Sequence, residues 1–353
     1  MIKQIVKTLD GNEATADVAY NFTEVATIYP ITPSSPMAEH VDVWSANGRK
    51  NLFGQPVKLV EMQSEAGAIG AVHGASETGS LCSSFTASQG LMLMIPVMHR
   101  LSGELKPVVL HIAARTVGTH TMSIFGDHSD VMGCRNTGWA MLCSASVQEC
   151  ADLAAVAHLS TIRGRVPFMH FFDGFRTSHE IQKIKMLPAE ELGKLIDRDA
   201  LYHFKHTGLN PEHPVMRSTV TNPDMFFQSR EANNPWYQRL PYIVQDYMDQ
   251  ISELTGRPYH LFDYYGAPDA EHVVIAMGSV TGAIQETIDK LCKEGKKVGF
   301  IQVHLYRPFS LEHFMKAMPD TVRTITVMDR TKEPGALGEP LYEDVCAAIS
   351  HVK

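Results

Sequence analysis

The sequence predicts an α/β protein in which a doubly wound, mostly parallel sheet is followed by a second, smaller α/β domain. Short apolar runs typical of buried strands alternate with segments of helical periodicity, which is the pattern of such sheets. Polar clusters follow several of these runs, at the positions where parallel sheets bind ligands. The chain has 353 residues, more than one hydrophobic core commonly fills, so two domains are expected.

Five apolar runs are predicted to be the strands of the first sheet: Val25–Tyr29, Val57–Val60, Leu81–Phe85, Pro107–Ala113 and Val166–Phe172. Their lengths fit buried strands. Asp10 can cap a helix over Ala14–Tyr20. A further helix is expected over Val147–Ile162, where apolar residues recur on one face.

Residues 61–89 hold two carboxylates, Glu61 and Glu65, followed by a run of glycines and alanines. We expect the two carboxylates one helical turn apart. Side chains this small let a helix lie against another backbone or a flat ligand. A carboxylate with apolar walls acquires a raised pKa and handles a proton near neutral pH. The residues alone fit equally well a packed helix whose two acids point to solvent.

Polar side chains follow four of the predicted strands. Thr32 lies in a rigid, proline-rich turn after the first strand, and Glu65 follows the second. Ser88 follows the third strand and Arg115 the fourth. Because the carboxyl ends of parallel strands share one edge of a sheet, we expect these four side chains to converge on a ligand site.

Residues 183–257 are proline-rich, polar and weakly periodic before Leu240. Four large apolar side chains lie in this stretch: Met225, Phe226, Phe227 and Trp236. Because such side chains are costly to expose, we predict a wrapping segment and not a disordered linker. A helix is expected from Leu240 to a stop at Gly256.

Three further strands are predicted near the carboxyl end: His272–Met277, Lys297–Val303 and Thr324–Met328. We therefore expect residues 1–257 to form the first domain, wrapping segment included, and residues 258–353 the second. The second domain holds few candidate catalytic residues, so packing and assembly are its expected roles.

The composition excludes several classes of function. With a formal charge of −8 and no strongly basic block, nucleic acid is not an expected partner. No apolar stretch suits a membrane span, and the first residues lack a signal peptide, so a cytoplasmic protein is expected. The six cysteines form no CxxC pair, which indicates free, mostly buried thiols and no iron–sulfur or zinc framework.

No metal site is predicted in this chain, because no HxH or HExxH pattern occurs; His170 is expected to be a half-buried strand residue. No phosphate-binding GxGxxG or GxxxxGK[ST] motif is present, and no GxSxG motif of hydrolases. Gly126-Asp127-His128 is similar to the start of the GDG…N motif that holds magnesium and diphosphate. It lacks the third glycine and the asparagines, so a loop with capping polar groups is predicted.

Eight segments carry a resemblance to a known family: YPITPSSPMAEHVD (29–42), EMQSEAGAIGAVHGA (61–75), TASQGLMLM (86–94), HIAARTVGTH (111–120), FGDHSDVM (125–132), FMHFFDGFRTSHEIQKI (168–184), YHLFDYYGAPDAEHVVIAMGS (259–279) and DRTKEPGALGEPLY (329–342). They resemble pyruvate:ferredoxin (flavodoxin) oxidoreductases across essentially the whole chain. The chain looks like the amino-terminal portion of such an enzyme. The resemblance implies a pyrimidine-binding domain of the thiamin diphosphate fold, followed by a domain similar to the transketolase carboxyl-terminal one.

The implied activity is oxidative decarboxylation of pyruvate with CoA to acetyl-CoA and CO2, with electrons passing to ferredoxin or flavodoxin. By the same resemblance, Glu65 falls on the glutamate that hydrogen-bonds N1′ of the thiamine aminopyrimidine, with Glu61 as the fallback. Arg115 falls on the arginine that holds the pyruvate carboxylate, and Thr32 on a threonine of the substrate pocket. Ser88 and Gln89 are expected among the cofactor-binding residues.

The resemblance also implies parts that these residues do not contain. In the family, a separate domain holds the diphosphate and Mg²⁺, cysteine-bound iron–sulfur clusters carry the electrons, and a further domain binds CoA. The second domain is expected to be incomplete. We therefore expect half an active site, inactive alone, within a homo-oligomeric enzyme. Two alternatives stay open: a related enzyme for another 2-oxoacid, and a non-catalytic assembly or binding module of the same fold.

Overall fold

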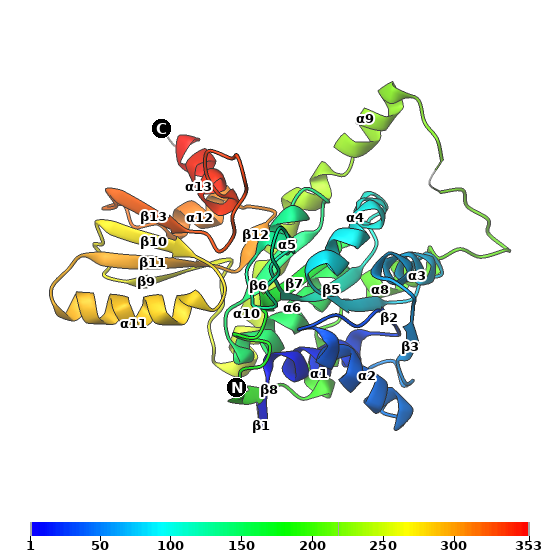
Figure 1. Ribbon diagram of the computed structural model, residues 1–353. Helices are drawn as coiled ribbons and strands as arrows, with labels where there is room; N and C mark the ends of the chain where they lie inside the picture. Colours follow the sequence, from blue (N-terminus) through cyan, green and yellow to red (C-terminus); the bar gives the residue numbers. More distant parts are fainter. Residues whose placement is uncertain (1, 218, 352–353) are drawn as a thin grey trace.

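The computed structural model describes residues 2–217 and 219–351 and has two principal sheets lying side by side (Figure 1). The larger sheet has seven strands: β2 (Val25–Ile28), β3 (Lys58–Glu61), β4 (Cys82–Thr86), β5 (Val108–Ala114), β6 (Ala140–Ser144), β7 (Phe168–Asp173) and β12 (Leu305–Arg307). Their order is β12-β6-β7-β5-β4-β2-β3. All pairs are parallel except β12 with β6, so the predicted fold class is confirmed.

The first half of the chain supplies six helices: α1 (Gly11–Phe22), α2 (Ser35–Ala46), α3 (Glu65–Glu77), α4 (Ser88–Gly103), α5 (Ser129–Gly133) and α6 (Val147–Gly164). They cover both faces of the larger sheet (Figure 1). Ala113 of β5 belongs to a core cluster formed with α1 and α2, whereas Leu110 and Ile112 belong to the larger core that includes α4. Asp10 accepts a hydrogen bond from the Glu13 amide, so the predicted cap is confirmed.

The segment predicted to wrap the first domain contains one strand and four helices: β8 (Gln182–Met186), α7 (Ala189–Lys194), α8 (Arg198–His206), α9 (Pro223–Glu231) and α10 (Asn234–Thr255). The helix stop at Gly256 is confirmed by its left-handed backbone, with φ of 77°. The prediction that the apolar side chains are buried is wrong for Met225, Phe226 and Phe227, which are 54%, 56% and 66% exposed.

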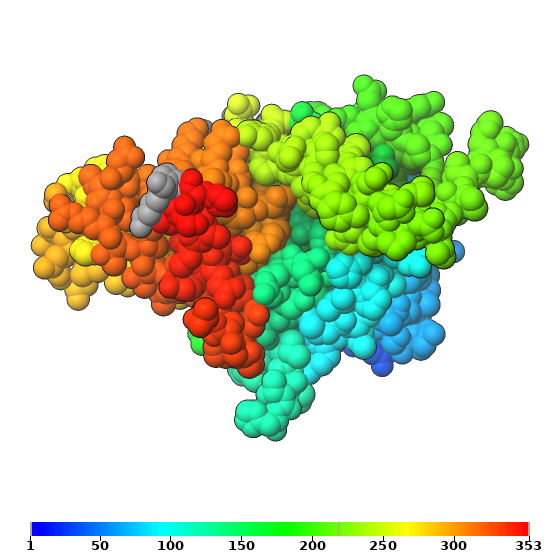
Figure 2. Space-filling view, turned by 90° about the horizontal axis from the view of Figure 1, so that it is seen from above, coloured from blue at the N-terminus to red at the C-terminus, as the bar shows by residue number. Residues whose placement is uncertain are grey.

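These exposed side chains lie on a projecting arm. Figure 1 shows α9 reaching beyond the body, and Figure 2 shows this green part of the chain from above. α9 has no buried residue, so its apolar side chains have no core to enter. Trp236, in the first turn of α10, is only partly exposed and packs against the main core.

The second half builds a four-stranded sheet in the order β13-β10-β11-β9. Its strands are β9 (Phe262–Gly266), β10 (His272–Ala276), β11 (Val298–Val303) and β13 (Thr324–Met328), and its helices are α11 (Val280–Lys293), α12 (Leu311–Ala317) and α13 (Pro340–Ser350). The three strands predicted here are confirmed. β12 leaves this unit and pairs with β6, which joins the two halves through the larger sheet.

Three strands of the first half escaped prediction. β1 (Ile5–Leu9) pairs with β8 on the surface, where half-exposed residues give no apolar run. β6 is fully buried, but its sequence AMLCS has no β-branched residue to indicate a strand. None of the helices in the described ranges combines the length and apolar character that crossing a bilayer requires.

Candidate active site

Glu61 and Glu65 do not share a helix, which corrects the predicted spacing of one helical turn. Glu61 is the last residue of β3 and is exposed, while Glu65 is the first residue of α3 and only 6% exposed. Ser64 between them is extended, and its hydroxyl accepts a hydrogen bond from the Gly67 amide at 3.1 Å. This serine cap fixes the start of the helix, so only Glu65 enters the protein.

The Glu65 carboxylate lies against the first turn of α4. A Cβ at Gly90 would stand 2.5 Å from Glu65 Oε1 and 2.8 Å from Thr86 Oγ1, so only glycine fits there. No described residue donates a hydrogen bond to the Glu65 carboxylate, and the buried Thr86 hydroxyl also lacks a partner. Gly90 thus forms the wall against which the Glu65 carboxylate lies. The glycines of α3 do not contribute to this wall, because no atom outside the helix's own backbone lies within 4 Å of a Cβ at Gly70 or Gly74.

Arg115 directly follows β5, as predicted, and is only 7% exposed. Its Nη1 donates to the Thr32 carbonyl at 2.7 Å and its Nη2 to Gln89 Oε1 at 3.1 Å. Its Nε is buried without a hydrogen-bond partner. Across the described residues no carboxylate pairs with this guanidinium. Arg115 is therefore a buried cation whose two acceptors are both neutral.

The structure brings the predicted site residues together. Thr32 contacts Arg115 through its backbone carbonyl. Ser88 donates its hydroxyl to the Thr116 carbonyl at 2.6 Å and also contacts Gln89 Oε1. Thr32, Ser88, Gln89 and Arg115 thus form one connected group, and Glu65 packs against the residue that follows Gln89.

Asp130 lies beneath this group and was not among the predicted site residues. It is fully buried and accepts three backbone hydrogen bonds, from Ser88, Arg115 and Val131. Burial raises the pKa of Asp130 to about 7, against the opposing effect of these N–H donors. The only sequence signal was its place in FGDHSDVM, one of the segments that carry the family resemblance, two residues after the predicted loop at Gly126-Asp127-His128.

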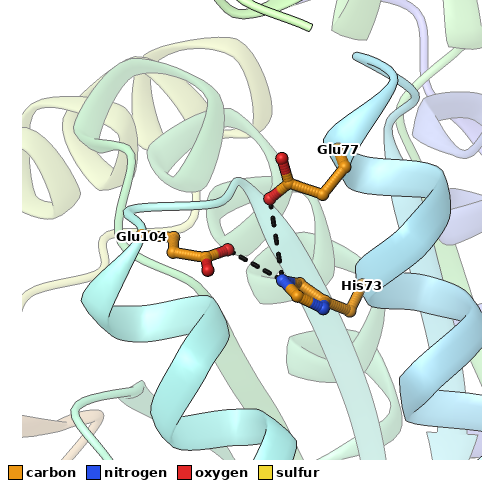
Figure 3. Close-up of side chains that lie close together, drawn as sticks. All are labelled: His73, Glu77 and Glu104. Carbon is orange, nitrogen blue, oxygen red and sulfur yellow. Dashed lines mark hydrogen bonds and ion pairs between the residues drawn. The ribbon is translucent and has the colours of Figure 1, made fainter. Parts of the chain in front are cut away.

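A histidine and two glutamates form a separate cluster where α3 meets the end of α4. His73 Nε2 lies 2.8 Å from Glu104 Oε2 and 3.6 Å from Glu77 Oε1 (Figure 3). Lys106 pairs with Glu77 at 2.7 Å, and Arg217 also pairs with it. Burial works against ionisation, but hydrogen bonds from these cations bring the pKa of Glu77 to about 2. Because two cations already neutralise Glu77, this cluster is an ion-pair network rather than a metal centre.

His170 lies in a strand as predicted, but it is fully buried and not half-buried. Its Nδ1 lies 2.9 Å from His111 Nδ1, and His111 Nε2 lies 3.0 Å from His158 Nε2. Burial lowers the pKa of all three imidazoles, to about 3 for His158 and His170. The histidines are therefore neutral core residues. The cysteines of the described chain are free thiols, and four of them are buried.

Two protein families match this chain. The family described as "Pyruvate flavodoxin/ferredoxin oxidoreductase, thiamine diP-bdg" matches residues 17–249. The family described as "Pyruvate:ferredoxin oxidoreductase core domain II" matches residues 270–353. Together they cover the larger sheet and three of the four strands of the smaller one, β9 lying between the two matches.

Relatives at high identity are similar to nearly the whole chain. Pyruvate:ferredoxin oxidoreductase of Moorella thermoacetica is 62% identical over 98% of this chain and 29% of its own length. Pyruvate-flavodoxin oxidoreductase of Klebsiella pneumoniae is 61% identical over 98% of this chain and 30% of its own length. The chain thus spans about three-tenths of the length of these relatives.

Among solved structures, 2-oxoglutarate:ferredoxin oxidoreductase from Magnetococcus marinus, with 2-oxoglutarate, coenzyme A and succinyl-CoA bound, has the same fold. The TM-score is 0.69 at 20% identity, over 98% of this chain and 60% of that one. The family matches and the high-identity relatives lead to one conclusion: this chain belongs to the pyruvate flavodoxin/ferredoxin oxidoreductase family and corresponds to its amino-terminal part.

Proposed function

We propose that this chain forms the substrate-facing half of the active site in a thiamine diphosphate-dependent pyruvate:ferredoxin or flavodoxin oxidoreductase. The enzyme would decarboxylate pyruvate oxidatively with CoA, giving acetyl-CoA and CO2. The observation that carries the proposal is Arg115, a buried guanidinium without a carboxylate partner in the described chain.

A buried charge is costly unless it is paired. Thr32 and Gln89 offer Arg115 only neutral oxygens. A 2-oxo acid carries a planar carboxylate, which a planar guanidinium recognises through two parallel hydrogen bonds. Bound pyruvate would therefore supply the counter-ion that Arg115 lacks, and Arg115 would orient the oxo acid for reaction.

The surroundings of Glu65 fit the thiamine cofactor. A mostly buried carboxylate with no described donor needs a polar partner from outside this chain. Gly90 leaves that carboxylate room that no other residue would. Glu65 would accept a hydrogen bond at N1′ of the aminopyrimidine and hold a proton there. Thiamine diphosphate, when bound, supplies the carbon nucleophile and electron sink that 2-oxoacid decarboxylation requires.

Ser88 and Gln89 were predicted to bind the cofactor. Among the described residues, the Ser88 side chain contacts Thr116 and Gln89, and the Gln89 side chain contacts Ser88 and Arg115. These contacts support a role in shaping the substrate pocket. Mg²⁺, the diphosphate and the iron–sulfur clusters are proposed to be held by domains outside these 353 residues.

We further propose the division into residues 1–257 and 258–353, with the second domain incomplete. The two family matches, to residues 17–249 and 270–353, support this boundary. In the complete enzyme the partners would be CoA and ferredoxin or flavodoxin, and the assembly a homo-oligomer in the cytoplasm. A different 2-oxoacid as substrate is the alternative, since the Magnetococcus structure has the same fold with 2-oxoglutarate bound.

The proposal is tested by fusing this chain to the remaining length of the Moorella thermoacetica enzyme and measuring pyruvate-dependent reduction of a viologen dye. Arg115→Ala should raise the KM for pyruvate about 10- to 100-fold, because hydrogen bonds to a charged group contribute about 1.5–3 kcal/mol. Arg100→Ala, on the exposed end of α4, is the matched control and should leave KM unchanged.

Three outcomes would contradict the proposal in different ways. An unchanged KM in Arg115→Ala would place the carboxylate contact elsewhere. Faster turnover of a bulkier 2-oxoacid than of pyruvate would change the substrate. A folded fusion inert toward every 2-oxoacid tested would favour a non-catalytic assembly module.

A further inference from the structure

We propose that Asp130 is a positioning residue, which fixes the direction in which Arg115 presents its guanidinium to the substrate. Asp130 Oδ2 accepts hydrogen bonds from the Ser88 amide at 2.7 Å and the Arg115 amide at 2.9 Å. Oδ1 accepts from the Val131 amide at 2.7 Å. The inference rests on the proposed role of Arg115 and adds a residue that does not itself touch the substrate.

Asp130 bridges two strands at the point where their own pairing stops. The last residues paired between β4 and β5 are Thr86 and Ile112. Beyond them, Ser88 and Arg115 each have a backbone N–H that no neighbouring strand accepts. A single carboxylate oxygen accepts both, so it sets the spacing between the start of α4 and the residue after β5. Without it, two buried donors would be left unpaired.

Ser88 makes this dependence stronger. Its φ of 49° lies in the left-handed region, which is strained for a residue with a Cβ. Such a conformation persists only where the surroundings hold it. Ala87 at the N-cap of α4 has no side chain to cap the helix, so the remote carboxylate of Asp130 supplies the cap.

A chain of contacts carries this positioning to the guanidinium. Ser88 contacts Gln89 Oε1, and the same oxygen accepts a hydrogen bond from Arg115 Nη2. A Cβ at Gly118 would come within 2.5 Å of Gln89 Nε2, so Gln89 has little room to turn. Asp130 therefore holds Arg115 at two points, directly at its backbone and indirectly at its side chain.

The short helix α5, which carries Asp130, is itself anchored through the residue that precedes it. Two residues earlier, the His128 amide donates to the Arg330 carbonyl at 2.8 Å, and His128 Nε2 lies 2.7 Å from Asp173 Oδ1. Both anchors belong to other parts of the fold, β7 and the turn after β13. Asp130 is thus held in a fixed position, and its hydrogen bond fixes the position of the Arg115 backbone.

The experiment uses the fusion with the Moorella thermoacetica enzyme described above. In Asp130→Asn, the amide group places its own N–H donors against one of the three backbone N–H groups. We expect the KM for pyruvate to rise about tenfold or more, with a smaller change in kcat. Asp127→Asn is the matched control, because Asp127 bonds only to Ser129 among the described residues, and its KM should stay within twofold of native.

A double variant separates positioning from general damage. If Asp130 acts through Arg115, the double variant should have nearly the same KM for pyruvate as Arg115→Ala alone. The fold-changes of the two single variants should therefore not multiply in the double variant. Multiplying effects, or a native KM in a folded Asp130→Asn, would overturn the inference. If Asp130→Asn does not fold, Asp130→Ser takes its place, because the smaller side chain leaves space for water to accept hydrogen bonds from the backbone N–H groups. The expected rise in the KM for pyruvate is the same.

Hydrogen exchange separates a failure of this inference from a failure of the proposed function. The Ser88 and Arg115 amides should exchange faster in Asp130→Asn than in the native protein, and should not in Asp127→Asn. If the native fusion does not use pyruvate, the proposed function fails, and unchanged exchange at both amides would then overturn the positioning role as well.

Discussion

Glu65 and Glu61 lie four residues apart, yet a strand ends at one and a helix begins at the other. This difference decides which carboxylate reaches the candidate site. The exposed Glu61 is solvated, whereas Glu65 is 6% exposed and faces the glycine wall of α4. A buried carboxylate has a fixed position, so it can exchange a proton with a ligand ring placed beside it. A solvated carboxylate has no such fixed position.

We therefore expect Glu65→Gln to lower the rate of pyruvate-dependent viologen reduction by about 10²- to 10⁴-fold, the range of general acid–base contributions. Circular dichroism and thermal unfolding should stay near native, because the amide has the same shape. Glu61→Gln, the control of identical chemistry, should retain the native rate. A near-native rate for Glu65→Gln would remove Glu65 from the proposed mechanism.

Single residues were predictable where they follow an apolar run directly. Arg115 follows a fully buried strand, so its place on the rim could be read from the sequence. Asp130 could not be found in this way, because its partners Ser88 and Arg115 come from the ends of two other strands. The contact of Thr32 through its carbonyl was equally hidden, because the direction of a backbone carbonyl depends on the course of the proline-rich turn and not on the type of side chain.

At the scale of elements, α4 shapes the candidate site more than α3 does. The glycines of α3 suggested a close-packed wall, but Gly70 and Gly74 face open space. Gly90, in the first turn of α4, is the glycine that lies against the Glu65 carboxylate. The side of α3 that each glycine faces depends on the residue at which the helix begins. Ser64 caps the helix, so α3 begins at Glu65, four residues after Glu61.

Gly90→Ala is expected to displace the Glu65 carboxylate, since the new methyl group would stand 2.5 Å from Oε1. Overpacking of this kind costs about 1–3 kcal/mol of stability. The rate of viologen reduction should fall by more than the lower fraction of folded protein explains. Gly74→Ala on α3 should instead stabilise the protein by up to about 1 kcal/mol in urea unfolding, because alanine is the better helix former. Equal behaviour of the two variants would contradict the assignment of the wall.

The buried histidines join β5, β7 and α6 and should make stability depend on pH. Their pKa values are lowered in the folded state, by burial first, so the unfolded chain binds more protons below pH 6.5. Stability should therefore fall as pH drops from about 6.5 toward 4, by about 1 kcal/mol per pH unit for each histidine. Asp130 opposes this trend, because its raised pKa favours the folded state at low pH.

Urea unfolding at pH 7.5 and pH 5 measures this dependence. His158→Gln keeps a polar partner for His111 and should make the fall in stability with acid shallower than in the native chain. Equal slopes for the two proteins would show that the histidines do not control it.

At the scale of the whole molecule, the two sheets are joined by chain crossing and by charge. β12 crosses from the second half to extend the first sheet beside β6. Asp173, at the end of β7, pairs with His128 and with Arg330 from the second half. These partners, against the opposing effect of burial, hold the pKa of Asp173 well below its usual range. The α/β order of both halves was predictable from periodicity, but a three-residue strand such as β12 leaves no periodic signal.

A chain cut after residue 257 should therefore aggregate. Removing β12 exposes the edge of β6, a fully buried apolar strand with unpaired N–H and C=O groups. Light scattering should show large particles for residues 1–257 and none for the 353-residue chain under the same conditions. A monodisperse fragment would show that the first half closes its sheet unaided.

The same crossing imposes an order on biosynthesis. A nascent chain leaves the ribosome amino end first, so β6 emerges long before Leu305–Arg307 can cover it. During that interval the growing sheet is unsealed on one side. We expect cells to shelter it with a chaperone, and translational pausing between residues 258 and 307 to be more harmful than pausing after them.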